Sequence, residues 1–187
     1  MNDIVNMDTI IGMPRSDHFI HGNGKTITVQ VTLNPNPLYR SLFPGGTINN
    51  LNVDGYIING RSAIASGGII SYCTNNVNNL THAGIVSHSG IILHCVNNGT
   101  TFGAGIVAEH AGTVSFCINT GQIISTTNNT GGIAASSLNG FVSIDNCINI
   151  GSVEGTNNVG GMIGEMRRGQ LSAIITNNIN YATIKRH

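Results

Sequence analysis

Apolar and polar positions recur along this chain with a fixed spacing of 22 residues. Segments 46–57, 68–79, 90–101 and 112–123 follow one pattern and read GTINNLNVDGYI, GIISYCTNNVNN, GIILHCVNNGTT and GTVSFCINTGQI. A fixed period of this size is typical of solenoids, in which each repeat forms one coil and buries its apolar face only against neighbouring coils. The pattern therefore predicts a stack of coils.

Each repeat places the same kinds of residue around one buried position, which is Leu51 in the first repeat and a cysteine afterwards. A β-branched residue stands three positions before it, an asparagine two after it and a glycine four after it, except that Val53 replaces the asparagine of the first repeat and Val77 the glycine of the second. These columns contain Ile48, Ile70, Ile92, Val114 and Ile144; Asn75, Asn97, Asn119, Asn149 and Asn180; and Gly55, Gly99, Gly121 and Gly151. β-Branched residues suit a buried pleated surface, and stacked asparagines can hydrogen-bond from coil to coil. We expect an asparagine ladder inside the stack and a glycine bend in each coil.

The segments before and between these repeats also predict strands. Alternating apolar residues from Ile27 to Leu33 follow a Gly-Asn-Gly turn, which indicates a strand with one buried face. In the later repeats the polar segments 125–130 and 154–159 add a turn on one edge. We predict an all-β, right-handed parallel β-helix of about six coils, each of roughly 22–31 residues. Residues 1–45 form an N-terminal entry strand or cap and a leading coil, and residues 46–187 form the repeats of a single continuous domain.

Composition narrows the range of partners. Charged residues form only 9% of the chain and the formal net charge is zero, so the sequence carries no electrostatic footprint for nucleic acid. No apolar run is long enough to span a bilayer. The N-terminus lacks the basic and apolar regions of a signal peptide, which indicates either a mature fragment with an added methionine or a chain that stays inside the cell.

The four cysteines, Cys73, Cys95, Cys117 and Cys147, belong to the buried column of the repeat. Their exchange with Leu51 indicates that this position requires a medium-sized apolar side chain. Buried free thiols are the favoured prediction. A disulfide between adjacent coils is the alternative, because stacked positions have nearly the Cα spacing that it needs. No CxxC spacing supports a metal site, and we expect no cofactor.

Several segments resemble the GLUG-motif repeat family. The segments that show this resemblance are GGTINNLNVDG at residues 45–55 and the small-residue segments GGIAA and GGMIG at 131–135 and 160–164. In addition, FIHGNGKTI at residues 19–27 is similar to the segment that precedes such repeats. The resemblance covers roughly residues 19 to 184. It implies parallel β-helix modules of secreted or surface-exposed bacterial proteins, many of them adhesin-like. It therefore implies an extracellular or cell-surface location, with surface glycans or host proteins as partners.

Carboxylates are the residues on which polysaccharide lyases and hydrolases with β-helical folds would depend. The repeats contain Asp54, Glu109, Asp145, Glu154 and Glu165. Asp54 aligns with Asn76, Asn98 and Thr120 and has no acidic neighbour in its column. Glu109 and Glu165 come near each other only if the intervening coils bring their edges together. Solvated surface carboxylates are the favoured prediction, with a catalytic pair as the alternative.

Aromatic side chains form a further column directly before the cysteine position: Tyr72, His94 and Phe116, flanked by Asn50 and Asn146. Stacked rings across parallel strands stabilise a sheet, and this structural role is the favoured interpretation. If the rings point outward, they also offer a binding site for a sugar or a partner protein. These three residues are the candidate ligand-binding residues of the chain.

His88 and His110 stand one period apart and are expected to stack. Surface stacking is favoured over a two-histidine metal site, because no third ligand is evident in the column.

The sequence favours a non-enzymatic scaffold that acts in adhesion, in glycan or partner binding, or in assembly, and no catalytic or metal-ligating residue is assigned. A carbohydrate-active lyase or hydrolase is the alternative. A self-assembling filament subunit is the third hypothesis, because the last coil has no obvious cap and its strand edges invite end-to-end or lateral association.

Overall fold

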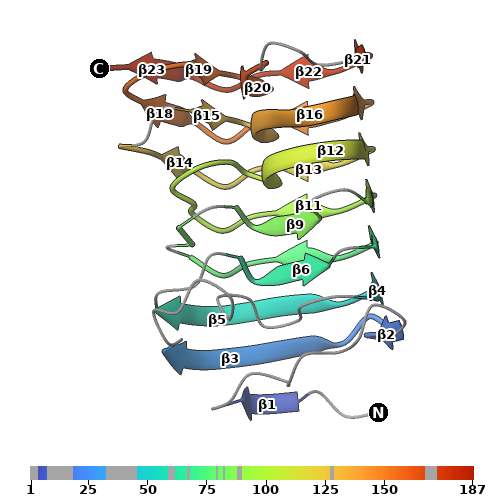
Figure 1. The fold of residues 1–187 in the computed structure, drawn as a ribbon. Coiled ribbons are helices and arrows are strands. Elements are labelled where there is room, and N and C mark those ends of the chain that lie inside the picture. Colours follow the sequence, from blue (N-terminus) through green and yellow to red (C-terminus); the bar gives the residue numbers. More distant parts are fainter. Residues whose placement is uncertain are drawn as a thin grey trace.

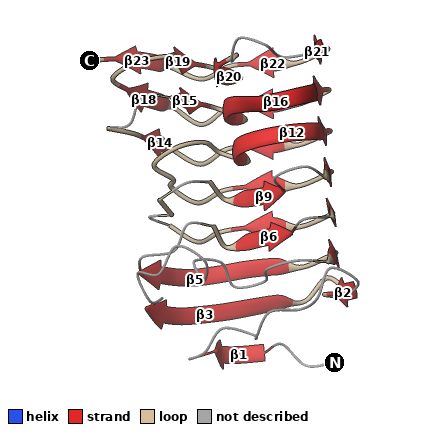
Figure 2. Cartoon of the chain, viewed as in Figure 1, coloured by secondary structure: helices blue, strands red, loops and turns tan. Residues whose placement is uncertain are grey.

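The protein is a stack of parallel β-strands (Figure 1). The computed structural model describes residues 4–7, 19–32, 46–58, 62–66, 68–78, 80–81, 83–87, 90–126, 129–166 and 172–187. Within these ranges every regular element is a strand, and the strands pair in parallel from one end of the stack to the other. Figure 2 shows the strands as successive layers, with the N-terminal strand at one end and the C-terminal strand at the other. The predicted all-β solenoid of parallel strands is confirmed.

Two large sheets run the length of the stack. The first, which we call the asparagine sheet, contains in order β1 (Ile4–Met7), β3 (Thr26–Thr32), β5 (Asn52–Ile58), β8 (Thr74–Asn75), β11 (Val96–Asn97), β13 (Ile118–Asn119), β17 (Ile148–Asn149) and β22 (Ile179–Asn180). The second, the isoleucine sheet, contains β2 (Phe19–His21), β4 (Thr47–Asn49), β7 (Ile69–Ser71), β10 (Ile91–Leu93), β12 (Val107–Ser115), β16 (Ala134–Asp145) and β20 (Ile163–Glu165), with β21 (Ser172–Thr176) also on β16. Each coil passes from the isoleucine sheet to the asparagine sheet.

Shorter sheets close the remaining sides of the coils. They contain β14 (Ile123–Ile124), β18 (Val153–Gly155) and β23 (Ile184–Arg186); β15 (Thr130–Gly131) and β19 (Val159–Gly160); and β6 (Ile64–Ser66) and β9 (Ile85–Ser87). The longer later coils were expected to carry polar turns at 125–130 and 154–159. Both segments instead contain strand residues at their ends, since Thr130 pairs with Val159 and Glu154 pairs with Lys185. The extra length therefore extends the coil with paired backbone as well as with turns.

The strand register follows the columns of the sequence. Ile70 pairs with Ile48 and with Ile92, Val114 pairs with Ile92, and Ile144 pairs with Val114. All five side chains are fully buried and belong to one continuous core. Because each coil places its β-branched residue directly on that of the coil below, the core is a thin column along the axis rather than a globular centre.

The predicted asparagine ladder is present and unbroken from Asn75 to Asn180. Each side-chain Nδ2 donates to the Oδ1 of the asparagine in the next coil, at 2.7 Å from Asn75 to Asn97, 2.8 Å from Asn97 to Asn119, 2.8 Å from Asn119 to Asn149 and 2.9 Å from Asn149 to Asn180. Asn119 also donates to the carbonyl of Gly121 in its own coil at 3.0 Å. These bonds satisfy amides that are completely buried at Asn75, Asn97, Asn119 and Asn149, whereas Asn180 at the end of the ladder is exposed.

The cysteines are buried free thiols, which confirms the favoured prediction. Each Sγ lies close to two backbone carbonyls, one in its own coil and one in the coil below; for Cys95 these are Leu93 at 3.2 Å and Ile70 at 3.7 Å. Burial raises the pKa of the Cys95 thiol well above its ordinary range. The column is therefore a buried, apolar part of the core.

The glycine column marks positions at which the surrounding backbone leaves no room for a Cβ. Among its members only Gly55 has a left-handed φ, of +104°. At the others the backbone of the coil below leaves no room, since a Cβ on Gly121 would lie 2.1 Å from the carbonyl oxygen of Gly99. Close approach of successive coils, rather than a strained φ, excludes side chains there.

In the part of the chain that the structure describes, no helix has the length and apolar character needed to cross a membrane.

The ladder generates a prediction about relative stability. Asn119→Ala should lower the free energy of unfolding by more than about 3 kcal/mol, because it leaves the buried partners of three hydrogen bonds unpaired. Cys117→Val should change it by less than about 1.5 kcal/mol, because the substitution nearly conserves volume at an apolar site. Urea denaturation, monitored by circular dichroism, measures both values. A larger loss for Cys117→Val than for Asn119→Ala would contradict this description of the core.

Candidate functional site

The three predicted site residues form one exposed stack, which we call the aromatic column: Tyr72, His94 and Phe116. Each lies between a strand of the isoleucine sheet and a strand of the asparagine sheet, at the corner of its coil. The ring centroids are 4.8 Å apart from Tyr72 to His94 and 4.9 Å apart from His94 to Phe116, with the ring planes within 10° of parallel. Tyr72 is 57% exposed and Phe116 50% exposed. The column is therefore both ordered by stacking and open to solvent.

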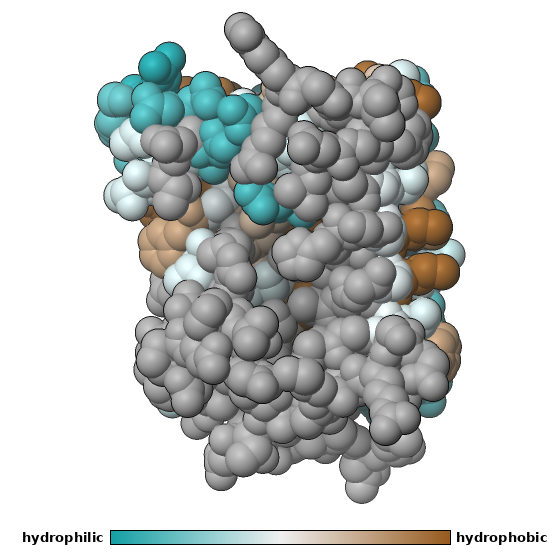
Figure 3. All heavy atoms as spheres, viewed as in Figure 1, coloured by the Kyte–Doolittle hydropathy of each residue, from teal (hydrophilic) through white to brown (hydrophobic). Residues whose placement is uncertain are grey.

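Other exposed apolar side chains lie on the same coils. Ile69 and Ile91 stand on the outer face of the isoleucine sheet, three positions before Tyr72 and His94. Figure 3 shows apolar side chains at the right-hand edge of the molecule, at the height of β6 and β9 in Figure 1. The middle coils thus expose several apolar side chains on their outer surface.

The backbone at the aromatic column is left-handed. Tyr72, His94 and Phe116 have φ of 53°, 52° and 54°. The same corner position in neighbouring coils is occupied by asparagine, the residue that tolerates this conformation best after glycine: Asn50, Asn146 and Asn177, with φ of 51–55°.

Placing an aromatic residue in the left-handed region costs roughly 1–3 kcal/mol. Two stacked ring pairs return about 0.5–1.5 kcal/mol each. Stacking therefore offsets only part of the strain at three exposed positions, and asparagine would meet the structural need at each of them. Because strained backbone positions cluster at functional sites, the strain at this exposed column supports a functional role.

Stacking also decides which part of each ring a ligand can reach. The faces of His94 lie against Tyr72 and Phe116, so the column presents ring edges to solvent. Aromatic edges carry the positive end of the ring quadrupole and favour contact with oxygen atoms. A ligand would meet a rim of C–H groups, together with the polar atoms of Tyr72 and His94. The sugar-binding site predicted from sequence therefore takes an edge-on form, and ligand contact itself stays a prediction.

The carboxylates of the repeats lie in different places. Register pairs Glu109 with Ser136, and Ser136 with Glu165, so the two glutamates share one column with a buried serine between them. Two strand spacings place their backbones about 9–10 Å apart. The Oε2 atom of Glu165 accepts a hydrogen bond from Asn129 at 2.7 Å. The stacking of the coils therefore places the two glutamates on the same edge of the molecule, and a catalytic pair stays a prediction.

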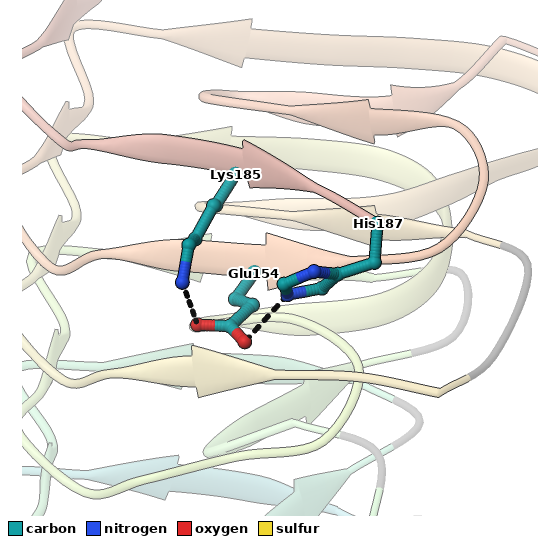
Figure 4. A network of polar contacts seen from close by, with 3 residues as sticks. All are labelled: Glu154, Lys185 and His187. Atoms are coloured by element: carbon teal, nitrogen blue, oxygen red, sulfur yellow. Dashed lines mark hydrogen bonds and ion pairs between the residues drawn. The ribbon is translucent and has the colours of Figure 1, made fainter.

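Asp54 accepts a hydrogen bond from the backbone N–H of Gly55 at 2.7 Å, whereas Asp145 and Glu154 take part in polar contacts at the C-terminal end. Figure 4 shows Glu154 between two groups of the last strand: His187 Nε2 lies 2.6 Å from its Oε1 and Lys185 Nζ lies 3.8 Å from its Oε2. The hydrogen bond to His187 is the main cause of a lowered Glu154 pKa. The Thr176 hydroxyl lowers the pKa of Asp145 in the same way. These acids tie β18 and β16 to the coil above them.

The predicted stack of His88 on His110 lies outside the described residues, because neither His88 nor the side chain of His110 is among them. The local register is nonetheless informative. Ala83 pairs with Ala104, a spacing of 21 residues, and the backbone of His110 pairs with Ser137. On this edge the period is one residue shorter than the 22 on which the prediction rested. Among the residues that the structure describes, no group of three or more His, Cys, Asp or Glu could hold a metal ion.

Comparisons of this chain with protein-family models, with curated proteins and with solved structures give no match. The resemblance to GLUG-motif repeats therefore stays a prediction from the motifs quoted above. The fold and the aromatic column define a parallel β-solenoid with an exposed, stacked aromatic corner.

The corner conformation generates a prediction about Phe116. Phe116→Asn should stay within about 1 kcal/mol of the parent in free energy of unfolding, since relief of strain offsets the lost ring contact. Phe116→Ala loses the ring but keeps a residue that disfavours the left-handed region, so it should be less stable than Phe116→Asn by roughly 1 kcal/mol. Thermal and urea unfolding of the pair measure this order. Equal stability of the two variants would mean that the corner has no left-handed requirement.

The contact between Glu154 and His187 generates a prediction about pH. A carboxyl with a lowered pKa contributes stability that is present above its unfolded-state pKa and is lost as the pH falls through the lowered value. In an NMR titration the Glu154 carboxyl should therefore titrate below the usual glutamate range. In His187→Ala it should titrate at higher pH than in the parent. An unchanged midpoint in the variant would show that the hydrogen bond does not hold the carboxylate in solution.

Proposed function

We propose that this chain is a right-handed parallel β-helix of about six coils that serves as a non-enzymatic scaffold of a surface or extracellular protein. It acts in adhesion through binding of glycans or partner proteins. The observation that carries this proposal is the aromatic column, which places three aromatic residues on strained, exposed positions where asparagine would suffice. The resemblance to GLUG-motif repeats supports the location.

Rigidity supports a binding role for the column. Backbone ladders and the buried asparagine ladder fix each corner, and the rings are stacked before any ligand arrives. A preordered surface loses little side-chain entropy on binding. Aromatic residues are also the type most enriched where binding energy is concentrated.

Two other functions each have one supporting observation. The shared column of Glu109 and Glu165 supports a carbohydrate-active enzyme, in which one glutamate would protonate the leaving group and the other would activate water. The outermost coil of the structure supports end-to-end assembly, since Ile175 and Ile179 are 41% and 43% exposed there. The strained aromatic column has no part in either function, and for this reason we place the scaffold first.

A panel of polysaccharides and surface proteins tests the proposed function. We expect the chain to be retained by at least one member without release of reducing ends or unsaturated products. The double variant Tyr72→Asn/Phe116→Asn should lose that retention and keep the parent melting temperature within a few degrees. Product release that is abolished by Glu109→Gln or Glu165→Gln would instead establish the enzyme. Sedimentation over a concentration series would reveal the filament as mass that grows with concentration.

A further inference from the structure

The outer face of the asparagine sheet changes together with the aromatic column. Four positions after each aromatic residue stands an outward-facing polar residue, and we call Asn76, Asn98 and Thr120 the outer polar column. In the coil below, the two positions are Asn50 and Asp54; in the coil above, they are Asn146 and Ile150. Aromatic corners and uncharged amide or hydroxyl positions therefore coincide in the same three coils and end at the same boundaries.

The outer polar column is ordered by its own hydrogen bonds. The Nδ2 of Asn98 donates to Oδ1 of Asn76 at 2.8 Å, and the Thr120 hydroxyl donates to Oδ1 of Asn98 at 2.6 Å. Each amide has two N–H groups and each oxygen two lone pairs, so these bonds use one N–H of Asn98 and leave donor and acceptor capacity facing solvent. Between the two columns stand the partly exposed, mostly apolar side chains of Thr74, Val96 and Ile118.

The chemistry of this face limits what it can bind. Its backbone groups are paired within the sheet, from Thr74 to Leu51 and from Val96 to Cys73, so a peptide cannot add to it as a strand. The described columns of these three coils contain no Asp, Glu, Lys or Arg, which disfavours nucleic acid and acidic polymers. An apolar strip between ring edges and amides instead suits a ligand that has apolar faces and many hydroxyl groups.

We propose that the face between the aromatic column and the outer polar column binds a neutral, linear β-linked polysaccharide that lies along the solenoid axis. This inference rests on the proposed binding function and names its ligand class. Coils repeat at about 4.8 Å, and the rings repeat at 4.8 and 4.9 Å. Each sugar of an extended β-(1→4)-linked chain spans a length similar to this coil spacing. Adjacent sugars are turned over relative to each other, so successive sugars lie on successive coils with opposite edges toward the aromatic column.

Each sugar in this arrangement contacts one coil in two ways. One edge of the sugar hydrogen-bonds to a member of the outer polar column, and the opposite edge meets an aromatic edge. Hydroxyl oxygens lie on both edges of each sugar, so both contacts are kept although the ring oxygen changes sides from one sugar to the next. Because three coils carry both columns, three sugars fill the face. Affinity should therefore rise from disaccharide to trisaccharide and then level off.

The experiment measures binding of cello- and chito-oligosaccharides of two to six units by titration calorimetry, with oligogalacturonates as the acidic comparison. We expect a rise of about tenfold or more in affinity between two and three units, little further gain, and no binding of oligogalacturonate. Phe116→Asn follows the neighbouring corner residue Asn146, and Thr120→Ile follows Ile150, so both variants use residues native to the column. Each should weaken trisaccharide binding by about fivefold or more.

Ile69→Thr is the matched control. It removes an exposed apolar side chain from the other sheet, at a position where β12 carries Thr113 in the same column, and it should leave affinity unchanged. Equal affinity for two and three units, binding of acidic chains alone, or insensitivity to Thr120→Ile would overturn the inference, even if Phe116→Asn abolishes retention by another member of the panel. If the parent chain binds no member of the panel, the proposed function is overturned as well.

Discussion

The fold depends on one constraint, which is that a polar group turned into a narrow coil must find its partner in the coil above or below. The asparagine ladder meets this need. Each buried amide bonds its own coil and its neighbour, as Asn97 does with Gly99 at 3.0 Å and with Asn119 at 2.8 Å. An unpaired amide there would lose the solvation it has in water. The ladder thus fixes the register of both large sheets, and the apolar columns of isoleucine and cysteine follow from that register.

Much of this architecture could be predicted because the constraint repeats. A residue type that recurs every 22 positions at a buried site has few explanations other than stacking, so the isoleucine, cysteine and asparagine columns appear in the structure as expected. The approach of Gly121 to the Gly99 carbonyl could not be read in the same way, since a glycine signals either crowding or a left-handed φ. The edge containing Ala83 and Ala104 has a spacing of 21 residues, which the small-apolar segments 83–87 and 104–108 also show in the sequence.

The candidate site was predictable as a column and not as a conformation. The sequence places Tyr72, His94 and Phe116 in register, but the left-handed backbone and the edge-on rings appear only in the structure. One signal was present, since Asn50 and Asn146 occupy the same corner and asparagine is the side chain best suited to it. Glu109 and Glu165 illustrate the opposite case, because their shared column depends on two coil lengths that differ from each other and from 22.

The asparagine ladder also gives the molecule a direction. Every side-chain amide donates toward the C-terminal side and accepts from the N-terminal side, so the amide dipoles add along the axis. The series begins above Val53, where the apolar side chain offers no amide oxygen or nitrogen, and runs to Asn180. The two ends of the ladder are therefore chemically unlike. A further amide can therefore extend this series only beyond Asn180, and only in the same orientation as the others.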